Sequence, residues 1–358
     1  MSEIDLNQIL AEFNIDSVIE EYGNGHINNT YLTNTPSYIL QKINTNVFKD
    51  PDGVMENIER VTAFLKEKII AEGGNPKRET MSVIKTCDGK CCYKYDDDNV
   101  FRVYDFVENT ITIEGDTSPQ TLFNAGKGFG KFQRMLDDFP ADTLHETIAD
   151  FHNTPKRVEA LKAAIAEDKA GRVAAVQAEI DFALKNAEFA DVIVKGIENG
   201  SIPLRVTHND TKINNILFDA DTKEAVCVID LDTVMPGSAL YDFGDALRMG
   251  GSTAAEDETN LDIVHFDPQA FESFTKGYCE EMLPKLTEAE IELLPFSVKL
   301  LTYECGIRFL TDYLNGDTYF RIHYENHNID RARNQFKLVA ELNEKEAELK
   351  EILKNCLK

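Results

Sequence analysis

The chain of 358 residues contains no tryptophan and is poor in positive charge, with 37 lysines and arginines against 63 aspartates and glutamates. Its formal charge of −26 repels nucleic acid and anionic membranes, and no segment dense in lysine or arginine argues otherwise. The absence of tryptophan weakly disfavours an aromatic cage for a quaternary ammonium group. Nucleic acid and membrane are therefore not expected partners, and no obligate protein partner is evident.

Long apolar runs are also missing, and no stretch approaches the roughly 20 residues needed to span a bilayer. The first residues, Met1-Ser2-Glu3-Ile4-Asp5, lack the basic region and apolar core of a signal peptide. A cytoplasmic location is therefore expected. The length is sufficient for one large bilobal unit or two domains, each with a buried core.

Cysteines are few, and their spacing does not indicate a metal site. The single cluster among the seven, Cys87-Asp88-Gly89-Lys90-Cys91-Cys92, straddles an Asp-Gly turn. A zinc site would need further Cys or His pairs at ligand spacing, and disulfides are unusual in a reducing compartment. We expect a hairpin with reduced thiols.

The most informative stretch covers residues 206–215. His208, Asp210 and Asn215 have the spacing of the kinase catalytic loop H-R-D-x-x-x-x-N, with Asn209 in place of the arginine. In that loop the Asp accepts the proton of the substrate hydroxyl and the Asn holds Mg²⁺. Asp210 is therefore the predicted catalytic residue.

A second metal-binding Asp should follow on the next strand. Residues 216–218 and 225–229 are short β-favouring runs separated by a polar turn. If they pair as a hairpin, Asp230 returns beside Asn215, and the two supply the oxygen ligands that Mg²⁺ prefers. The predicted metal ligands are Asn215 and Asp230.

Asp242 is the rival, because it begins a literal D-F-G string. It lies beyond a turn at residues 235–238 and outside the predicted hairpin. We interpret Asp242 as a scaffold residue that caps a helix through residues 245–248.

These residues resemble the aminoglycoside phosphotransferase and choline kinase superfamily, which phosphorylates small-molecule hydroxyls on a protein-kinase-like fold. More narrowly, residues 22–31, 201–215, 229–237 and 304–310 resemble bacterial N-acetylhexosamine 1-kinases, and the similarity extends along nearly the whole chain. The resemblance implies an α+β bilobal fold. The expected lobes are a small antiparallel β-rich nucleotide-binding lobe at residues 1–107 and a larger, mainly helical catalytic and substrate-binding lobe at residues 108–358.

The expected N-terminal lobe has strand signals at residues 38–43, 82–86 and 100–104 and a helix signal at residues 54–67. Gly23 and Gly25 precede the first of these strands, where a kinase places the loop that covers the phosphates. Lys42 is then the candidate for the α- and β-phosphates, held by a carboxylate of the following helix. Glu59 is preferred as that carboxylate, and Glu56 stays open.

A glycine-rich string at residues 126–130 also resembles a nucleotide loop, but it lies inside a helical pattern of aromatic residues. Close helix packing explains its glycines better. The lobes should join near residues 104–109, where the family's linker backbone bonds adenine, which places Phe106 and Glu108 at the nucleotide. Beyond the linker, residues 157–187 and 330–358 predict amphipathic helices.

The resemblance also implicates His26, Asp210, Arg308 and Tyr319 in holding an N-acetylhexosamine, whose hydroxyls and acetamido group suit such donors and acceptors. For Arg308 the alternative is an ordinary helix ion pair with Glu304, four residues earlier.

The implied activity is transfer of the ATP γ-phosphoryl group to the anomeric hydroxyl of GlcNAc or GalNAc, with Mg²⁺ as cofactor. The alternatives are a kinase for an aminoglycoside, choline or ethanolamine, or homoserine, and a catalytically inactive kinase-like binding protein.

Overall fold

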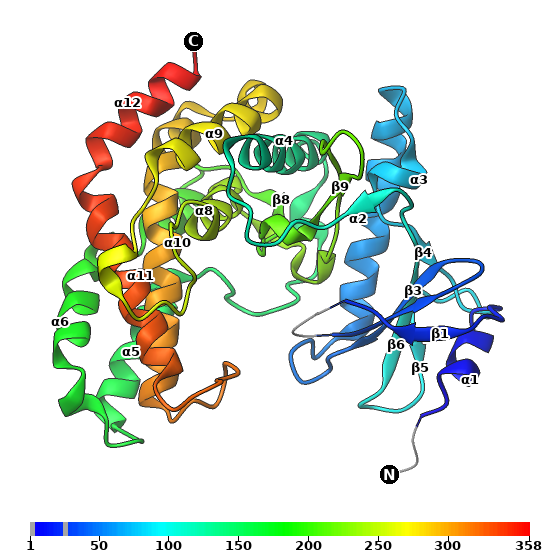
Figure 1. Cartoon of the computed structure of the whole chain (residues 1–358), viewed down its shortest axis with the longest axis horizontal. Coiled ribbons are helices and arrows are strands. Elements are labelled where there is room, and N and C mark those ends of the chain that lie inside the picture. The colour runs from blue at the N-terminus through cyan, green and yellow to red at the C-terminus, as the bar shows by residue number, and fades with distance from the viewer. Residues whose placement is uncertain (1–3, 24–27) are drawn as a thin grey trace. The chain divides into compact units, whose positions relative to one another are not determined.

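The computed structural model describes residues 4–23 and 28–358 (Figure 1). Its contacts divide the chain into two compact units. The first, here the sheet unit, comprises residues 1–113, 135–149 and 215–236, and the second, the helical unit, comprises 114–134, 150–214 and 237–358. The predicted α+β class is confirmed. The lobe boundary after residue 107 stays a prediction.

The sheet unit is built on an antiparallel sheet in the order β1-β2-β3-β6-β4, with β5 also paired to β6. Its strands are β1 (Ile19–Glu21), β2 (Asn29–Thr33), β3 (Tyr38–Ile43), β4 (Val83–Ile84), β5 (Tyr93–Lys94) and β6 (Val100–Asp105). The predicted strand at residues 38–43 is confirmed over the same residues, and that at 100–104 extends by one. The signal at residues 82–86 yields only the two residues of β4.

Strand alternation gives this sheet two different faces. Leu40, Phe101 and Val103 form one buried cluster with residues of α1 (Leu6–Ala11). The opposite face carries Gln41 and Arg102, which meets Met55 of α2 (Pro51–Ala71). Because successive side chains of a strand point to opposite faces, neighbouring residues of β3 have different surroundings. Helix α2 confirms the helix predicted at residues 54–67 and extends beyond it at both ends.

The sheet unit also contains a small sheet in the order β10-β9-β7. Its strands are β7 (Thr110–Ile111), β9 (Ile216–Asp219) and β10 (Ala225–Val228), and α3 (Pro76–Glu79) also belongs to this unit. The predicted hairpin of residues 216–218 with 225–229 is confirmed. Strand β11 (Met235–Gly237) follows it.

Helices dominate the second unit, together with strand β8 (Arg205–Thr207). They are α4 (Pro119–Met135), α5 (Thr154–Glu167), α6 (Gln177–Lys185), α7 (Val192–Glu198), α8 (Ala239–Gly250), α9 (Pro268–Met282), α10 (Glu288–Leu314), α11 (His327–Glu344) and α12 (Glu346–Cys356). Among the described residues, no helix has the length and apolar character that crossing a membrane requires.

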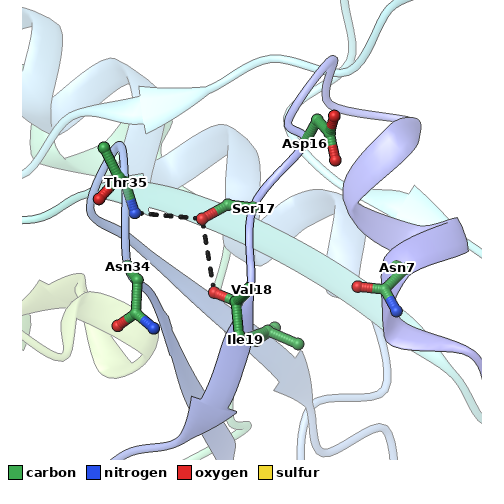
Figure 2. A pocket seen from close by; sticks show the side chains of 7 residues that line it. All are labelled: Asn7, Asp16, Ser17, Val18, Ile19, Asn34 and Thr35. Atoms are coloured by element: carbon green, nitrogen blue, oxygen red, sulfur yellow. Dashed lines mark hydrogen bonds between the residues drawn. The ribbon is translucent and has the colours of Figure 1, made fainter.

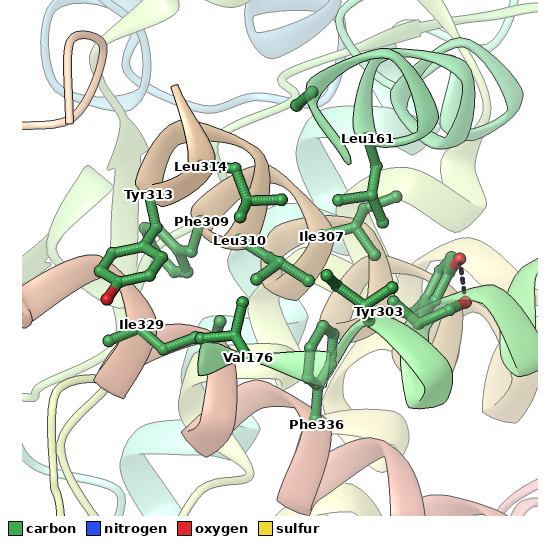
Figure 3. Close-up of a cluster of buried hydrophobic side chains, with 14 of the residues drawn as sticks. Leu161, Val176, Tyr303, Ile307, Phe309, Leu310, Tyr313, Leu314, Ile329 and Phe336 are labelled. Atoms are coloured by element: carbon green, nitrogen blue, oxygen red, sulfur yellow. Dashed lines mark hydrogen bonds between the residues drawn. The ribbon is translucent and has the colours of Figure 1, made fainter. Parts of the chain in front are cut away.

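The core of the helical unit forms around α10. Figure 3 shows Ile307, Leu310 and Leu314 of this helix among side chains of α5 and α11. Tyr303 is buried in the same cluster, and its hydroxyl donates to the carbonyl oxygen of Ala183 at 2.8 Å. Since a buried hydroxyl is costly without a partner, this bond lets α10 bring a polar atom into the core.

The glycine-rich string at residues 126–130 lies in α4, as predicted. A side chain at Gly126 would clash with the carbonyl oxygen of Phe274, and one at Gly130 would come within 2.8 Å of that of Tyr278. Both carbonyls belong to α9. The glycines serve helix packing rather than a nucleotide.

Two local expectations are corrected. The helical signal at residues 157–187 is two helices, α5 and α6, because Asp168 takes a left-handed conformation (φ 40°) and Gly171 follows it at φ 68°. The turn between Cys87 and Cys92 is present, but β4 and β5 pair with β6 rather than with each other. All seven cysteines are free thiols.

Candidate active site

The hairpin of β9 and β10 places Asp230 beside Asn215 in the sheet unit. The strands pair antiparallel with Ile216 opposite Val228, and the backbone N–H of Ile229 donates to the carbonyl oxygen of Asn215 at 2.9 Å. This bond joins the residue before Asp230 to Asn215 itself. The approach of the two chain segments that the sequence predicted is therefore present, and metal binding by the pair stays a prediction.

Asp230 holds an uncommon backbone conformation, with φ 58° and ψ 58°. A non-glycine residue in this left-handed region costs of order 1 kcal/mol and often marks a functional site. An amide and a carboxylate supply hard oxygen donors but too few to enclose an ion, which suits Mg²⁺, a cation that keeps waters and nucleotide phosphates as ligands. The donor set fits the implied metal.

The predicted catalytic loop is held by Asp242 in the helical unit. The backbone N–H groups of His208 and Asn209 donate to its two carboxylate oxygens at 2.9 and 2.7 Å, and Gln133 adds a side-chain bond at 2.7 Å. Burial raises the pKa of Asp242, although these donors act against the shift. The predicted scaffold role of Asp242 fits these contacts.

The predicted helix cap is a different residue. Helix α8 begins at Ala239, and its N-cap is Ser238, whose side chain accepts from the N–H of Leu240. Asp242 lies inside the first turn and reaches across to the loop. The correction has a simple cause, because the helix begins several residues before the segment at 245–248 that the sequence suggested.

Further contacts fix the rest of this loop. The N–H of Thr211 donates to Asp245 at 3.0 Å, and its hydroxyl donates to the carbonyl oxygen of Asp242 at 2.6 Å. Burial opposes the charged form of Asp245, but Arg248 and other cations keep its pKa below the ordinary value. The ring of His208 is fully buried and its Nδ1 accepts from the N–H of Asp210 at 3.2 Å. The loop that carries Asp210 is therefore rigidly supported.

Lys212 is a residue that the sequence reasoning missed. Its ammonium lies 2.8 Å from the nearer oxygen of Asp210. Burial works against the charged form of Lys212, but Asp210 raises its pKa above the ordinary value. A basic residue two positions after the predicted catalytic Asp was the signal available in the sequence.

The sequence reasoning also missed the pair of His152 and Glu304, which supports the loop that carries Asp210. Nδ1 of His152 lies 2.8 Å from Glu304, and its Nε2 lies 3.2 Å from the carbonyl oxygen of Asn209. The other oxygen of Glu304 accepts from Thr154 at 2.6 Å. Burial would raise the pKa of Glu304, but His152 holds it below the ordinary value. No spacing rule could have joined residues so far apart in the chain.

Arg308 does not form the ordinary ion pair with Glu304. Among the contacts of the described residues, both Glu304 oxygens go to His152 and Thr154. The Arg308 guanidinium instead lies over three aromatic rings, those of Phe151, Tyr319 and Phe320, at 5.4, 6.0 and 5.5 Å. The structure thus brings Arg308 and Tyr319 together.

The segment that carries Tyr319 is fixed by one carboxylate. Backbone N–H groups of Thr318, Tyr319 and Phe320 donate to Asp312 at 2.8–2.9 Å. The side chain of Tyr319 is itself 64% exposed, so its ring is open to a ligand at this surface.

The predicted nucleotide residues in the sheet unit are partly described. Gly23 has φ 73°, a conformation that favours glycine, and the ring of the preceding Tyr22 meets that of Phe106 edge-on at 6.2 Å. The glycine turn and the expected adenine-binding segment therefore lie close together. Glu108 is exposed. Gly25 and His26 lie outside the described residues.

The expected pairing of Lys42 with Glu59 is wrong. Glu59 pairs with Lys85 and also accepts from Cys91 at 2.8 Å, while the alternative, Glu56, lies 2.9 Å from His145. Strand alternation puts Lys42 on the face of β3 that packs on α1, away from α2. The periodicity of the helix could not show which face of the sheet Lys42 takes, because that depends on how β3 pairs with its neighbours and what packs on each face.

Comparison with known proteins decides the family. Residues 18–274 match the model of the phosphotransferase enzyme family, which is more than half of the chain. The chain belongs to this family. It is therefore a phosphotransferase.

Three solved structures illustrate the fold of this phosphotransferase. An aminopropanol kinase associated with a microcompartment has 14% identity, a TM-score of 0.60, and coverage of 96% of this chain and 97% of its own. Spectinomycin phosphotransferase has 14% identity and a TM-score of 0.59 over 96% and 98%. Choline kinase from Streptococcus pneumoniae has 14% identity and a TM-score of 0.54 over 94% and 97%. This similarity shows the fold that these small-molecule kinases share.

A depression of about 610 Å³ lies on the sheet unit beside β1 (Figure 2). Its lining includes Ser17 and Val18, and the hydroxyl of Ser17 accepts from the N–H of Thr35 at 3.2 Å. No predicted site residue of the phosphotransferase lines it, so it carries no functional argument.

Proposed function

We propose that this phosphotransferase transfers the γ-phosphoryl group of ATP to the anomeric hydroxyl of an N-acetylhexosamine, GlcNAc or GalNAc. The observation that carries the proposal is the support of the Asp210 loop by Asp242, Asp245 and His152. A loop held by buried carboxylates and a buried imidazole presents one carboxylate with little freedom. Such preorganisation is what a phosphoryl transfer requires of its protein.

In this mechanism Asp210 orients the sugar hydroxyl and accepts its proton, while Lys212 holds the Asp210 carboxylate in place. Asn215 and Asp230 would hold Mg²⁺, which neutralises charge on the phosphates when bound. Gly23, Gly25, Phe106 and Glu108 are proposed for the nucleotide. Lys42 is not assigned to the phosphates, because it lies on the face of β3 that packs on α1. Because the transition state is loose, positioning and charge neutralisation outweigh base strength.

The substrate assignment is supported by the surroundings of Arg308. An arginine stacked on aromatic rings, with no carboxylate paired to it among the described residues, presents a planar fork of donors. A sugar offers an apolar ring face for aromatic contact together with hydroxyl and amide acceptors. His26 and Tyr319 are proposed for the same substrate.

A coupled ADP-release assay tests the function. GlcNAc, GalNAc, choline, homoserine and kanamycin are each supplied with MgATP. Turnover with the hexosamines far above the other compounds is expected. Turnover with choline, homoserine or kanamycin instead assigns another small-molecule kinase of the same fold, and nucleotide binding without any product assigns an inactive binding protein.

Arg308→Lys is expected to raise the KM for hexosamine about tenfold or more while the KM for ATP changes little, because an ammonium cannot reproduce the planar guanidinium fork. Steady-state kinetics with each substrate varied in turn provide the measurement.

Arg331→Lys is the matched control, since Arg331 also stacks on an aromatic ring of the helical unit, that of Phe309 at 5.2 Å. Its sugar KM is expected to stay near that of the wild type. Unchanged sugar kinetics in Arg308→Lys would remove Arg308 from the site and weaken the hexosamine assignment.

A further inference from the structure

Asp232, two residues after Asp230, is buried in the sheet unit and both of its carboxylate oxygens are engaged. Oδ1 pairs with the guanidinium of Arg102, and Oδ2 accepts from the side chain of Asn28 at 2.7 Å. The side chains of Arg102 and Asp232 are only 1% and 3% exposed. Asp230 and Asp232 form an Asp-x-Asp pattern, but the protein's own side chains engage the second carboxylate.

Arg102 anchors this contact in the centre of the main sheet. Its Nε and Nη2 both donate to Oε1 of Gln41, at 3.0 and 2.8 Å. Gln41 is the residue of β3 that pairs with Arg102. Gln41 in turn donates to Thr30 of β2 at 3.1 Å. The guanidinium also lies 5.2 Å from the ring centre of Tyr104. Three strands therefore fix the position of one charge.

Asn28, immediately before β2, ties the same carboxylate to the main sheet. It follows directly on the segment that contains Gly23 and Gly25, and its Oδ1 accepts from the N–H of Asn44 at 3.0 Å. Asp232 thus joins the turn after Asp230 to the start of β2 and, through Asn28, to the end of β3.

Helix α2 holds the same turn from its other end. Asn57 of α2 is fully buried, and its side chain donates to the carbonyl oxygens of Val234 at 2.9 Å and of His145 at 2.8 Å. The turn from Leu231 to Thr233 is therefore fixed on both sides, and the left-handed conformation of Asp230 lies immediately before it.

We infer that the buried Arg102–Asp232 pair is a positioning device that holds the Asp230 turn for Mg²⁺-dependent nucleotide binding, and that Asp232 is not a metal ligand. This inference rests on the proposed metal role of Asp230. The guanidinium of Arg102 lies on the face of the sheet toward α2, where the sequence analysis had expected Lys42. Residues that support ligands in this way typically change metal affinity about 10–100-fold when replaced.

Binding of a fluorescent ATP analogue, titrated with and without Mg²⁺ and without any sugar, tests the inference. Arg102→Met is expected to weaken Mg²⁺-dependent nucleotide binding about tenfold or more, with Mg²⁺-free binding changed less than about twofold. Arg102→Lys should recover part of the loss, because an ammonium can pair with Asp232 but cannot also span Gln41. The double variant Arg102→Met/Asp232→Asn should lose no more than the worse single variant, as expected for two residues that act as one unit.

Arg172→Met is the control for general destabilisation, because it breaks another largely buried ion pair, with Asp317, in the helical unit. Melting temperatures are measured for all variants, and the binding comparison is made where each is folded. If Arg102→Met does not fold, the comparison rests on Arg102→Lys. A metal-ligand role for Asp232 predicts the opposite pattern, in which Arg102→Met frees the carboxylate and preserves or strengthens the Mg²⁺ dependence. That result overturns the inference, as does an additive loss in the double variant.

The failure of the proposed function looks different. A wild-type protein without Mg²⁺-dependent nucleotide binding contradicts the metal site itself. A wild-type protein that binds MgATP but phosphorylates no hexosamine contradicts only the substrate.

Discussion

Replacing Asp210 with asparagine is expected to lower kcat by roughly a hundredfold or more and to leave MgATP binding nearly intact, since the variant lacks the positioned proton acceptor. The surrounding loop should hold its shape, because its supports from Asp242, Asp245 and His152 go to backbone atoms or to the loop's other residues. Steady-state kinetics with the best substrate and a nucleotide titration measure the two quantities separately.

Lys212→Met is the matched control for this variant. It removes the partner of the Asp210 carboxylate but keeps the carboxylate itself, so its loss of kcat should be smaller than that of Asp210→Asn. Near-wild-type turnover in Asp210→Asn would show that the assigned role is wrong.

Asp230→Ala is expected to abolish Mg²⁺-dependent nucleotide binding in a folded protein, because one of the two proposed Mg²⁺ ligands is lost. Asp242→Ala should act on stability instead. It leaves the buried N–H groups of His208 and Asn209 and the amide of Gln133 without their acceptor. Since each unsatisfied buried group costs about 1–3 kcal/mol, the free energy of unfolding should fall by several kcal/mol.

Melting temperature and MgATP affinity, measured for both variants, distinguish the roles. A loss of Mg²⁺ dependence in the Asp242 variant alone would transfer the metal role from Asp230 to Asp242. A loss of stability in Asp230→Ala equal to that in Asp242→Ala would show that Asp230 is also structural.

Local sequence patterns were sufficient for several features of the structure. The strands at residues 38–43 and 100–105, the hairpin of β9 and β10, and the packing role of Gly126 and Gly130 follow from alternation, turn residues and helical periodicity. Each of these signals lies within a short stretch of the chain, so it can be read without knowing the tertiary contacts. Helix α2 extends beyond the predicted residues 54–67 at both ends, and the break between α5 and α6 depends on a left-handed Asp168 that periodicity cannot detect.

In the candidate site, too, local residues were predictable and long-range contacts were not. The order and spacing of His208, Asp210, Asn215 and Asp230 were sufficient to select the predicted catalytic loop and metal turn. The side chains that support them were not predictable. Asp242 reaches the loop from the first turn of α8 and Glu304 reaches it through His152 from α10, while Arg102 lies 130 residues before its partner Asp232.

The sequence by itself therefore determined which chemical groups are available and in what order, because the residues of the phosphoryl-transfer motif lie close together in the chain. Only the tertiary structure decided which partner each charged group takes. Glu59 pairs with Lys85 rather than Lys42, and Glu304 pairs with His152 rather than Arg308. The partner of a charged group, half-exposed as in Glu59–Lys85 or buried as in Glu304–His152, is set by which faces of strands and helices meet. That is a property of the packed fold rather than of any local stretch, and for a buried charge the lack of a partner is costly.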